Sequence, residues 1–571
     1  MPVHNADIAA ALDQIADLLE LKNDNPFRIR AYRNAARIVG AFGQDIKSVF
    51  DRGGELPKLP GIGPDLAGKI HEITASGSCR LLDELQQQFP PAVTELLKLP
   101  GLGPKRVKTL YDRLKLQTFE ELRAAANAEK IRELPGFGAR TEEHILQALA
   151  ARTAGSRRFR LATAVQYADA LLAYLRKCRG VEQVTVAGSY RRRRDTVGDL
   201  DIVITAAPGS AVMNRFCDYD EVREVLARGE TRASVVLKAG LQVDLRLVPR
   251  VSYGAALHYF TGSKAHNIAI RRLGQGRGLK INEYGVFRGE RRIAGETEQS
   301  VYDAVGLPYI EPELREDRGE IEAARRGELP QLVTLPELKG DLHTHTKASD
   351  GHHTIEEMAL AARRAGLQYM AITEHSRRLA FARGLDPQRL AKQADEIDRV
   401  NEKLDGITVL KGIEVDILED GSLDLPDSVL KRLDIVVGAV HSAFDLPRRA
   451  QTDRLLRAMD NRHLRLLAHP CGRLIGEREP YDVDMLAVIR KEKKTGCVLE
   501  LNAQPERLDL DEVHCQMARD EGVLLAVDSD AHYTHEFSNL RYGIGQARRG
   551  WLEAKDVLNT RALAELKRML R

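Results

Sequence analysis

The stretch VAGSYRRRRDTVGDLDIVI, residues Val186–Ile204, places four consecutive arginines ahead of an apolar strand. Side chains alternate between the two faces of a strand, so Asp199 and Asp201 share one face and apolar residues share the other. A third acid, Asp244, lies in LQVDLRLV on the same polar face as Arg246. Three carboxylates on neighbouring strands can hold two Mg²⁺ ions, which stabilise the attacking and leaving oxygens of phosphoryl transfer. The pattern favours a strand-based two-metal site.

The segment before this strand is suited to a phosphorylated substrate. A turn at Gly188 and Ser189 offers backbone N–H groups and a hydroxyl, and Arg192 offers a bidentate guanidinium. We interpret the arginines as a counter-charge for a triphosphate. Taken alone, two aspartates spaced in this way favour the plainer alternative, a solvated edge strand with an accidental acid pair.

Composition limits the fold and the compartment. A chain of 571 residues is too long for one core, so two to four domains are expected. The net charge of +3 does not mark a nucleic-acid binder, so any basic surface must be local. Six scattered cysteines without a CxxC pair suit a reducing compartment. With no run of about 18 apolar residues and no signal-peptide layout, a cytoplasmic protein is expected.

An internal repeat marks the helical first 150 residues. LPGIGPDLAGKI (59–70), LPGLGPKRVKTL (99–110) and LPGFGARTEEHI (134–145) share the form LPGxG followed by a helix. Glycine permits a tight turn that exposes backbone N–H groups at a helix N-terminus, which favours a DNA phosphate. A single copy could be an ordinary helix connection, whereas three copies resemble helix-hairpin-helix motifs. The candidate DNA-binding glycines are Gly61, Gly63, Gly101, Gly103, Gly136 and Gly138.

The second half alternates short apolar runs with charged helical segments. The runs DLHTH, YMAIT, ITVLKGIEV, DIVVGAV, LRLLAHP, CVLELN and VLLAVDSD make seven strands at a spacing typical of βαβ units. An α/β barrel or a parallel sheet is therefore expected beyond a polar connector at 316–336.

Metal-ligand residue types follow six of these strands, where α/β barrels place their active sites. A lone HxH pair is more often a satisfied pair of histidines, but nine donors favour a catalytic cluster of two or three ions. A His/Asp/Glu set without cysteine suits Zn²⁺ or Mn²⁺. The candidate ligands are His343, His345, Asp350, His375, Glu414, His441, His469, Asp530 and His532.

The order GSYRRRRDTVGDLDIVI, VDLRLV, YFTGSKAHNIAIR and INEYGVF resembles the palm and thumb of family X DNA polymerases, and the resemblance covers residues 1 to about 315. It implies that Asp199, Asp201 and Asp244 are the catalytic metal ligands, with Asp244 as the base for the primer 3′-hydroxyl. The residues that it implies for the triphosphate, the sugar, the base pair and the template strand are Gly188, Ser189, Arg192, Gly198, Tyr259, Phe260, Gly262, Asn267 and Arg271.

Two lysines need separate treatment in the resemblance to family X polymerases. Lys264 stands where better-known animal members have an acid, so we expect a nucleotide contact of its own or a lysine that merely points into solvent. Lys69 matches the amine that forms a Schiff base in the family's deoxyribose-phosphate lyase site. The alternative for Lys69 is a simple DNA phosphate contact, since Asp65 and Phe27 are candidates for replaced lyase positions.

The second half resembles the polymerase and histidinol phosphatase (PHP) domain over residues 337 to about 571, and all nine ligand positions match. In that family the cluster activates water against a phosphoester. Glu500 and Asn502 are expected to shape the pocket, and Arg378, Arg383 and Arg473 are candidates for contacts with DNA phosphates.

The combined prediction is a multidomain, bacterial-type family X DNA polymerase that fills gaps in base-excision repair. Its PHP domain is expected to act as a 3′–5′ exonuclease and an AP endonuclease. The expected partners are gapped or nicked double-stranded DNA and deoxynucleoside triphosphates, and the chain is expected to be a monomer near the bacterial nucleoid. The alternatives are a template-independent nucleotidyltransferase, a polymerase with a non-nuclease PHP phosphatase, and a non-catalytic DNA-binding module.

The expected domains follow from the two resemblances. They are a helical lyase-like domain at 1–80, helix-hairpin-helix fingers at 81–152, an α+β nucleotidyltransferase palm at 153–252, a thumb at 253–315, a linker at 316–336 and a seven-stranded α/β PHP barrel at 337–571.

Overall fold

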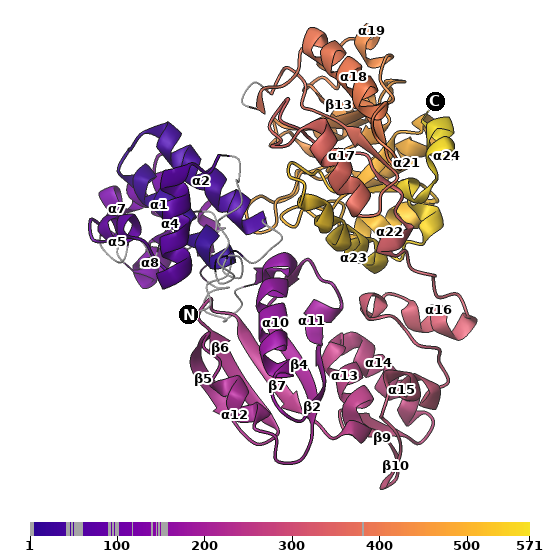
Figure 1. Ribbon diagram of the computed structural model, residues 1–571. Helices are drawn as coiled ribbons and strands as arrows, with labels where there is room; N and C mark the ends of the chain where they lie inside the picture. The colour runs from indigo at the N-terminus through magenta and orange to yellow at the C-terminus, as the bar shows by residue number, and fades with distance from the viewer. Residues whose placement is uncertain are drawn as a thin grey trace.

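The computed structural model consists of a helical N-terminal unit, a central palm and thumb, and a C-terminal barrel (Figure 1). It describes residues 5–41, 46, 50, 61–89, 93, 96–97, 102–116, 118–138, 141–143, 145–146, 149, 158–379 and 382–570. No helix among these residues is both long enough and apolar enough to cross a bilayer.

The N-terminal unit is helical wherever it is described, as predicted. Its helices are α1 (Asn5–Leu21), α2 (Pro26–Ala41), α4 (Pro64–Ser76), α5 (Arg80–Gln86), α7 (Pro104–Leu114) and α8 (Phe119–Asn127). Their apolar faces meet in one core that contains Leu12, Ile70 and Leu110, and Tyr533 of the barrel joins the same cluster. Helices α4 and α7 each begin with proline directly after a glycine, because proline has the φ that a helix requires and its missing N–H costs nothing in the first turn.

The palm is a five-stranded sheet in the order β2-β4-β7-β6-β5, with β4 and β7 parallel and the other neighbours antiparallel. Apolar side chains of β4, such as Ile202, pack with helix α10 in one core. The palm elements are β1 (Phe159–Arg160), α10 (Leu161–Arg176), β2 (Val181–Val186), α11 (Gly188–Arg191), β3 (Thr196–Val197), β4 (Asp199–Ala206), α12 (Val212–Cys217), β5 (Val222–Arg228), β6 (Arg232–Leu237) and β7 (Gln242–Leu247).

The thumb combines short helices with a three-stranded antiparallel sheet. Its elements are η1 (Arg250–Ser252), α13 (Tyr253–Thr261), α14 (Lys264–Gln275), β8 (Lys280–Asn282), β9 (Gly285–Arg288), β10 (Arg291–Ala294), α15 (Glu298–Ala304) and η2 (Pro312–Leu314). The connector at 316–336 contains α16 (Glu320–Arg326), whose buried Ile321 and Ala324 belong to the thumb core together with Trp551 of the barrel. The connector is thus packed between the two halves.

The C-terminal barrel contains the seven predicted strands, parallel and in sequential order. A bridge between Thr344 and Ala531 joins the first strand to the last. The strands are β11 (Gly340–Asp341), β12 (Tyr369–Ile372), β13 (Thr408–Asp416), β14 (Ile435–Ala439), β15 (Leu466–Leu467), β16 (Val498–Asn502) and β17 (Leu525–Asp528). The helices are η3 (Leu335–Glu337), α17 (Ile355–Arg364), α18 (Pro387–Asn401), α19 (Asp427–Leu430), α20 (Arg448–Ala458), α21 (Met485–Thr495), α22 (Glu512–Glu521), η5 (Glu536–Asn539), α23 (Leu540–Arg549), η6 (Ala554–Asp556), η7 (Leu558–Thr560) and α24 (Leu563–Met569). The predicted fold class is confirmed.

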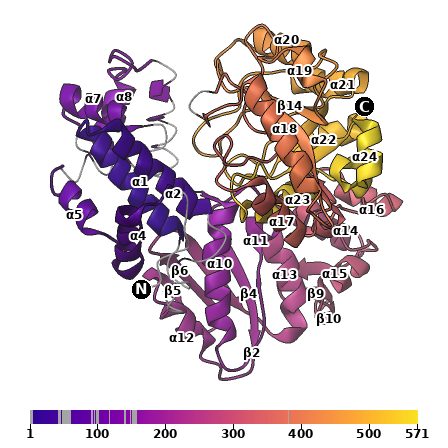
Figure 2. The ribbon, with the colours of Figure 1, turned by 45° about the horizontal axis from the view of Figure 1, so that its top comes forward.

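The barrel contacts the palm through helix α23, which lies beside α11 (Figure 2). Gly545 of α23 lies within van der Waals range of Arg193, since a Cβ atom there would lie 3.4 Å from the Cβ atom of Arg193. Arg160 of the palm also donates to the main-chain oxygen of Ile475 over 3.1 Å. The barrel and the palm are therefore joined by direct contacts.

Candidate active sites

The parallel pairing of β4 and β7 brings the palm acids together. The register sets Asp201 opposite Asp244 and Asp199 opposite Gln242. Ser234, which faces Asp244 from β6, donates to Oδ1 of Asp244, and Nε2 of Gln242 donates to Oδ2 over 3.2 Å. Hydroxyl and amide donors thus orient the carboxylate that the family resemblance assigns as the base.

The three palm carboxylates repel one another, and this repulsion favours the binding of cations between them. Burial is the largest cause that raises the pKa of Asp201, to about 7, and repulsion from Asp199 and Asp244 adds to it. The pKa of Asp199 is raised by burial and by Asp244. Divalent cations would remove this repulsion, and an all-oxygen donor set fits Mg²⁺.

The turn at the start of α11 lies directly against the acids. Gly188 has φ +63°, and a Cβ atom there would lie 2.7 Å from Oδ2 of Asp201, so the position requires glycine. Ser189 follows in α11. Gly198 directly precedes β4, and a Cβ atom there would lie 3.5 Å from the guanidinium of Arg158.

The arginine run differs from the prediction that it serves mainly as counter-charge for a substrate. Arg191 binds both carboxylate oxygens of Glu298, over 2.9 and 2.6 Å. Arg193 packs against α23, and Arg194 lies 3.7 Å from Glu316. These three side chains therefore contact the thumb, the connector or the barrel. Arg192 also pairs with Glu316 of the connector, but it is the member of the run that lies beside the acids and the Gly262 turn.

The motif YFTGS forms the end of α13 and the start of α14. Gly262 has φ +70°, and a Cβ atom there would lie 3.1 Å from Nη1 of Arg192. Nδ2 of Asn267 donates to the main-chain oxygen of Tyr259 over 2.7 Å. The guanidinium carbon of Arg271 lies 6.0 Å from the ring centroid of Tyr259, which also packs edge-on against Phe260.

Lys264 is exposed at the first position of α14, directly after the Gly262 turn. No ion pair joins it to any described residue. The unpaired ammonium group is therefore available to a ligand or to solvent.

The hairpin glycines leave helix N-termini open. Gly61 and Gly136 have φ of +77° and +82°, and Gly63 and Gly103 are the N-caps of α4 and α7. A glycine N-cap has no side chain to occupy the first-turn N–H groups, so these groups can bind a phosphate. In the third hairpin the main-chain oxygen of Gly138 accepts from the N–H of Glu142 over 3.0 Å. Gly101 lies outside the described residues.

The surroundings of Lys69 do not favour a Schiff-base amine. Its ammonium group forms an ion pair with Asp65 one helical turn away. Burial lowers the pKa of Lys69, but Asp65 and Tyr32 outweigh it and the net pKa is raised. A nucleophilic lysine requires the neutral amine, whereas these neighbours stabilise the ammonium form.

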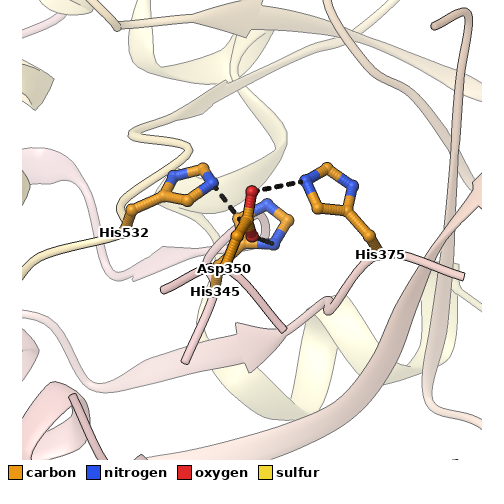
Figure 3. Close-up of side chains that lie close together, drawn as sticks. All are labelled: His345, Asp350, His375 and His532. Carbon is orange, nitrogen blue, oxygen red and sulfur yellow. Dashed lines mark ion pairs between the residues drawn. The ribbon is translucent and has the colours of Figure 1, made fainter. Parts of the chain in front are cut away.

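The predicted barrel ligands meet at one end of the barrel, beyond the carboxyl ends of the strands. Three groups of side chains bring their ligand atoms within 4.8 Å of one another: His345, Asp350, His375 and His532; His343, His345 and Asp530; and His375, Glu414 and His441. In the first group Asp350 lies between the rings of His375 and His532 (Figure 3), with its oxygens 3.3 and 3.4 Å from their Nε2 atoms. His469 lies beside the third group, with Nε2 3.3 Å from Glu414.

Several of these atoms are buried and have no hydrogen-bond partner among the described residues. They include Nε2 of His343, both ring nitrogens of His345 and Oε2 of Glu414. Nδ1 of His375 lies 2.5 Å from Oε2 of Glu414. Ring nitrogens and carboxylate oxygens that converge in this way fit a shared cation, and the His/Asp/Glu set fits Zn²⁺ or Mn²⁺.

Burial keeps part of the imidazole set neutral. The pKa of His345 falls to about 4, first because of burial and then because of His532 and His375. The pKa of His469 falls to about 3 for the same main reason. Burial raises the pKa of Glu414, but His375, His441 and His343 outweigh it and hold that pKa well below its usual range. Burial opposes them, but the facing carboxylates raise the pKa of His343, His375, His441 and His532, so a cation would displace protons from these imidazoles.

Two further carboxylates orient the imidazoles from outside. Glu500 contacts Nδ1 of His343 over 2.7 Å and accepts from the main-chain N–H of His469 over 2.7 Å. Asp416 contacts Nδ1 of His441 over 3.0 Å. Such partners fix the tautomer and leave Nε2 for the metal. The sequence interpretation missed Asp416, although it follows Glu414 by two residues and so shares its strand face.

The basic residues near the barrel divide into two groups. Arg473, expected at DNA phosphates, instead lies 3.2 Å from Asp195 of the palm and donates to the main-chain oxygens of Arg507 and Leu508. Arg383 is exposed, and Arg378 lies 3.2 Å from Asp416 beside the cluster. Arg473 therefore joins the two halves, Arg378 pairs with a carboxylate beside the cluster, and Arg383 stays available to a ligand.

Comparison with family models accounts for most of the chain. The matches are a helix-hairpin-helix domain over residues 3–79, a SAM-like helix-hairpin-helix tandem over 93–151, a DNA polymerase beta palm over 163–253, a DNA polymerase beta thumb over 256–316 and a PHP domain over 341–484. Each match falls on the part of the fold that has the corresponding architecture.

The chain is 40% identical over 576 residues, covering 100% of both proteins, to the DNA polymerase/3′-5′ exonuclease PolX of Bacillus subtilis (strain 168). The chain is also 30% identical over 232 residues, 38% of this chain and 89% of the relative, to a probable phosphatase of Thermoanaerobacter sp. (strain X514). It is 32% identical over 205 residues, 34% of this chain and 75% of the relative, to a probable phosphatase of Caldanaerobacter subterraneus. The palm acids, the barrel cluster and the full-length match together lead to one conclusion: the chain belongs to the bacterial family X DNA polymerases that carry a C-terminal PHP domain.

Proposed function

We propose that this protein is a DNA-directed DNA polymerase that fills short gaps during base-excision repair and removes 3′ residues with its PHP domain. The observation that carries the proposal is the β4–β7 register, which pairs Asp201 with Asp244 beside the Gly188 turn. The Bacillus subtilis relative, named a DNA polymerase/3′-5′ exonuclease, supports both activities.

In the palm, Asp199, Asp201 and Asp244 would hold two Mg²⁺ ions, which supply charge neutralisation for nucleotidyl transfer when bound. Asp244, oriented by Ser234, accepts the proton of the primer 3′-hydroxyl. The Gly188 turn and Arg192 orient the triphosphate. Their arrangement positions reactants rather than forming a covalent intermediate.

The remaining nucleotide-contact assignments follow the family resemblance. Ser189 and Gly198 line the phosphate side, and Tyr259, Phe260 and Gly262 line the sugar side. Lys264 lies beside the incoming nucleotide, Asn267 faces the base pair, and Arg271 faces the template strand.

In the barrel, nine side chains would hold two or three ions of Zn²⁺ or Mn²⁺, which would supply Lewis-acid activation of water for phosphodiester cleavage when bound. Glu500 and Asp416 keep His343 and His441 in the tautomer that presents Nε2 to the cluster. Hydrolysis at abasic sites would use the same cluster.

The DNA partner is double-stranded DNA with a gap or a nick. Helix N-termini at Gly63 and Gly103 bind its backbone without reading bases, so binding is independent of sequence. The protein acts as a monomer beside the bacterial nucleoid. We do not assign lyase activity to Lys69, because its ion pair with Asp65 stabilises the ammonium form.

A second candidate for the barrel is a phosphatase that removes 3′-phosphates, since two relatives of this segment are named probable phosphatases. A template-independent transferase is less well supported, because the chain matches hairpin and thumb models.

One gapped duplex, labelled at both ends of the primer, tests these assignments. With Mg²⁺ and nucleotides we expect addition of the templated residue, and with Mn²⁺ and no nucleotides we expect shortening from the 3′ end. Extension that ignores the templating base would favour the transferase. Release of a 3′-phosphate without shortening would favour the phosphatase.

A further inference from the structure

Arg549, the last residue of barrel helix α23, reaches into the polymerase half. Its side chain is 1% exposed. Nη1 donates to the main-chain oxygen of Arg192 over 2.8 Å and to Oε1 of Glu316 over 2.9 Å. Nη2 donates over 2.7 Å to Glu512 at the start of α22. One buried guanidinium thus ties two barrel helices to the palm turn and to the segment that leaves the thumb.

Glu316 is shared between two guanidinium groups. Its Oε1 atom accepts from Arg549 and also from Nε of Arg192, over 3.0 Å. Nη1 of Arg192 donates over 2.5 Å to the main-chain oxygen of Thr261, beside the Gly262 turn. Burial raises the pKa of Glu316, but Arg192 and Arg549 outweigh it and lower that pKa. The carboxylate therefore stays ionised and fixes the orientation of Arg192.

We infer that Arg549 is a positioning residue for nucleotide binding, through which the docked barrel sets the conformation of Arg192. This inference rests on the proposed contact between Arg192 and the triphosphate. Arg549 acts in two ways. It anchors the main chain of the turn that carries Arg192, and it neutralises part of the charge of Glu316.

Loss of Arg549 would remove both the main-chain anchor and the neutralisation of Glu316, and each loss would weaken nucleotide binding. Glu316 would keep Arg192 as its close partner, with Arg194 farther away at 3.7 Å. A buried carboxylate with fewer partners holds the remaining guanidinium more strongly and competes with the triphosphate for it. The turn would also lose its main-chain anchor. Nucleotide affinity should fall, and by reciprocity a bound nucleotide should tighten the docking of the barrel.

Arg548 supplies a matched control. It is the neighbouring residue on α23 and also crosses to the polymerase half, where Nε lies 2.8 Å from Glu313. Both of these ion pairs are largely buried, but Glu313 does not contact Arg192 in any described interaction. Arg548→Met therefore removes a comparable interdomain ion pair without disturbing the triphosphate arginine.

The experiment measures KM for the nucleotide and kcat for filling a one-nucleotide gap, together with 3′-end degradation, in full-length variants. Arg549→Met should raise KM about tenfold, the effect of one charge-assisted hydrogen bond, with a smaller change in kcat and unchanged degradation. Arg548→Met should leave KM within about twofold of wild type. Adding Glu316→Gln to Arg549→Met should lower KM again, because the competing charge is gone.

Equal KM values for Arg549→Met and Arg548→Met would overturn the inference, as would parallel loss of extension and degradation in Arg549→Met. If Arg549→Met is insoluble, Arg549→Lys decides, since an ammonium group keeps the charge but lacks the separate guanidinium nitrogens that contact Glu316 and Glu512 at once. A KM about threefold higher supports the inference and an unchanged KM overturns it. Arg192→Met distinguishes failure of the proposed triphosphate contact from failure of the positioning role. If Arg192→Met leaves KM unchanged, the triphosphate contact is refuted. If Arg192→Met raises KM while Arg549→Met does not, only the positioning role of Arg549 is refuted.

Discussion

Asp201→Asn should stabilise the metal-free protein. The palm holds three carboxylates close together, and without bound cations their negative charges repel one another. Asparagine keeps the shape of the side chain and removes its charge. The pKa of Asp201 is raised from 3.8 to about 7 by burial and by repulsion from Asp199 and Asp244. Such a shift corresponds to about 4 kcal/mol, and screening by solvent at this partly exposed group reduces it to about 2–4 kcal/mol.

The sign of the pH dependence follows from proton binding. Between the ordinary pKa of 3.8 and the raised value of about 7, the folded state holds a proton that the unfolded state has released. Stability of the wild type therefore falls as pH rises through this window, and the deficit is complete above it. Asp201→Asn lacks this dependence, so its advantage should be small near pH 4 and full near pH 8.

Calorimetry in EDTA between pH 4.5 and 8 measures this advantage. Asp218→Asn is the control, because Asp218 is exposed beside Arg228 and should change stability by less than about 0.5 kcal/mol. Excess Mg²⁺ at pH 8 should stabilise the wild type and leave Asp201→Asn nearly unaffected, since a ligand stabilises only a state that binds it. An Asp201→Asn variant no more stable than wild type at pH 8 in EDTA would refute the reasoning.

Other variants test the separate sites. Asp244→Ala should abolish primer extension, by loss of a metal ligand, while 3′-end degradation persists; loss of both activities in a folded protein would contradict independent sites. His343→Ala combined with His345→Ala should abolish degradation and lower bound metal measured by mass spectrometry, with gap filling retained; unchanged metal content would count against the cluster. Lys264→Asp should weaken nucleotide binding in EDTA about ten- to a hundredfold, measured by titration, and equal affinities would show that Lys264 serves only solvent.

The grouping of the residues at both sites could be predicted from local periodicity. A strand alternates its faces, so the spacing of Asp199 and Asp201 was enough to predict that they share one face. In the barrel, parallel strands in sequential order bring their carboxyl ends to one rim. Ligand residue types at those ends, from His343 to His532, therefore had to meet, even though 189 residues separate them in the chain. Both predictions depend on regular geometry that repeats along the chain.

What only the tertiary structure decided is which charged group meets which partner. Arg192 and Arg473 are both arginines near phosphate-binding motifs, yet one lies beside the acids and the other is held by Asp195 of the palm. Lys69 matches a lyase amine, but its ion pair with Asp65 stabilises its charged form. Arg549 contacts residues hundreds of positions earlier in the chain. Long flexible side chains reach partners set by the docking of whole domains, and no local pattern in the sequence encodes that docking.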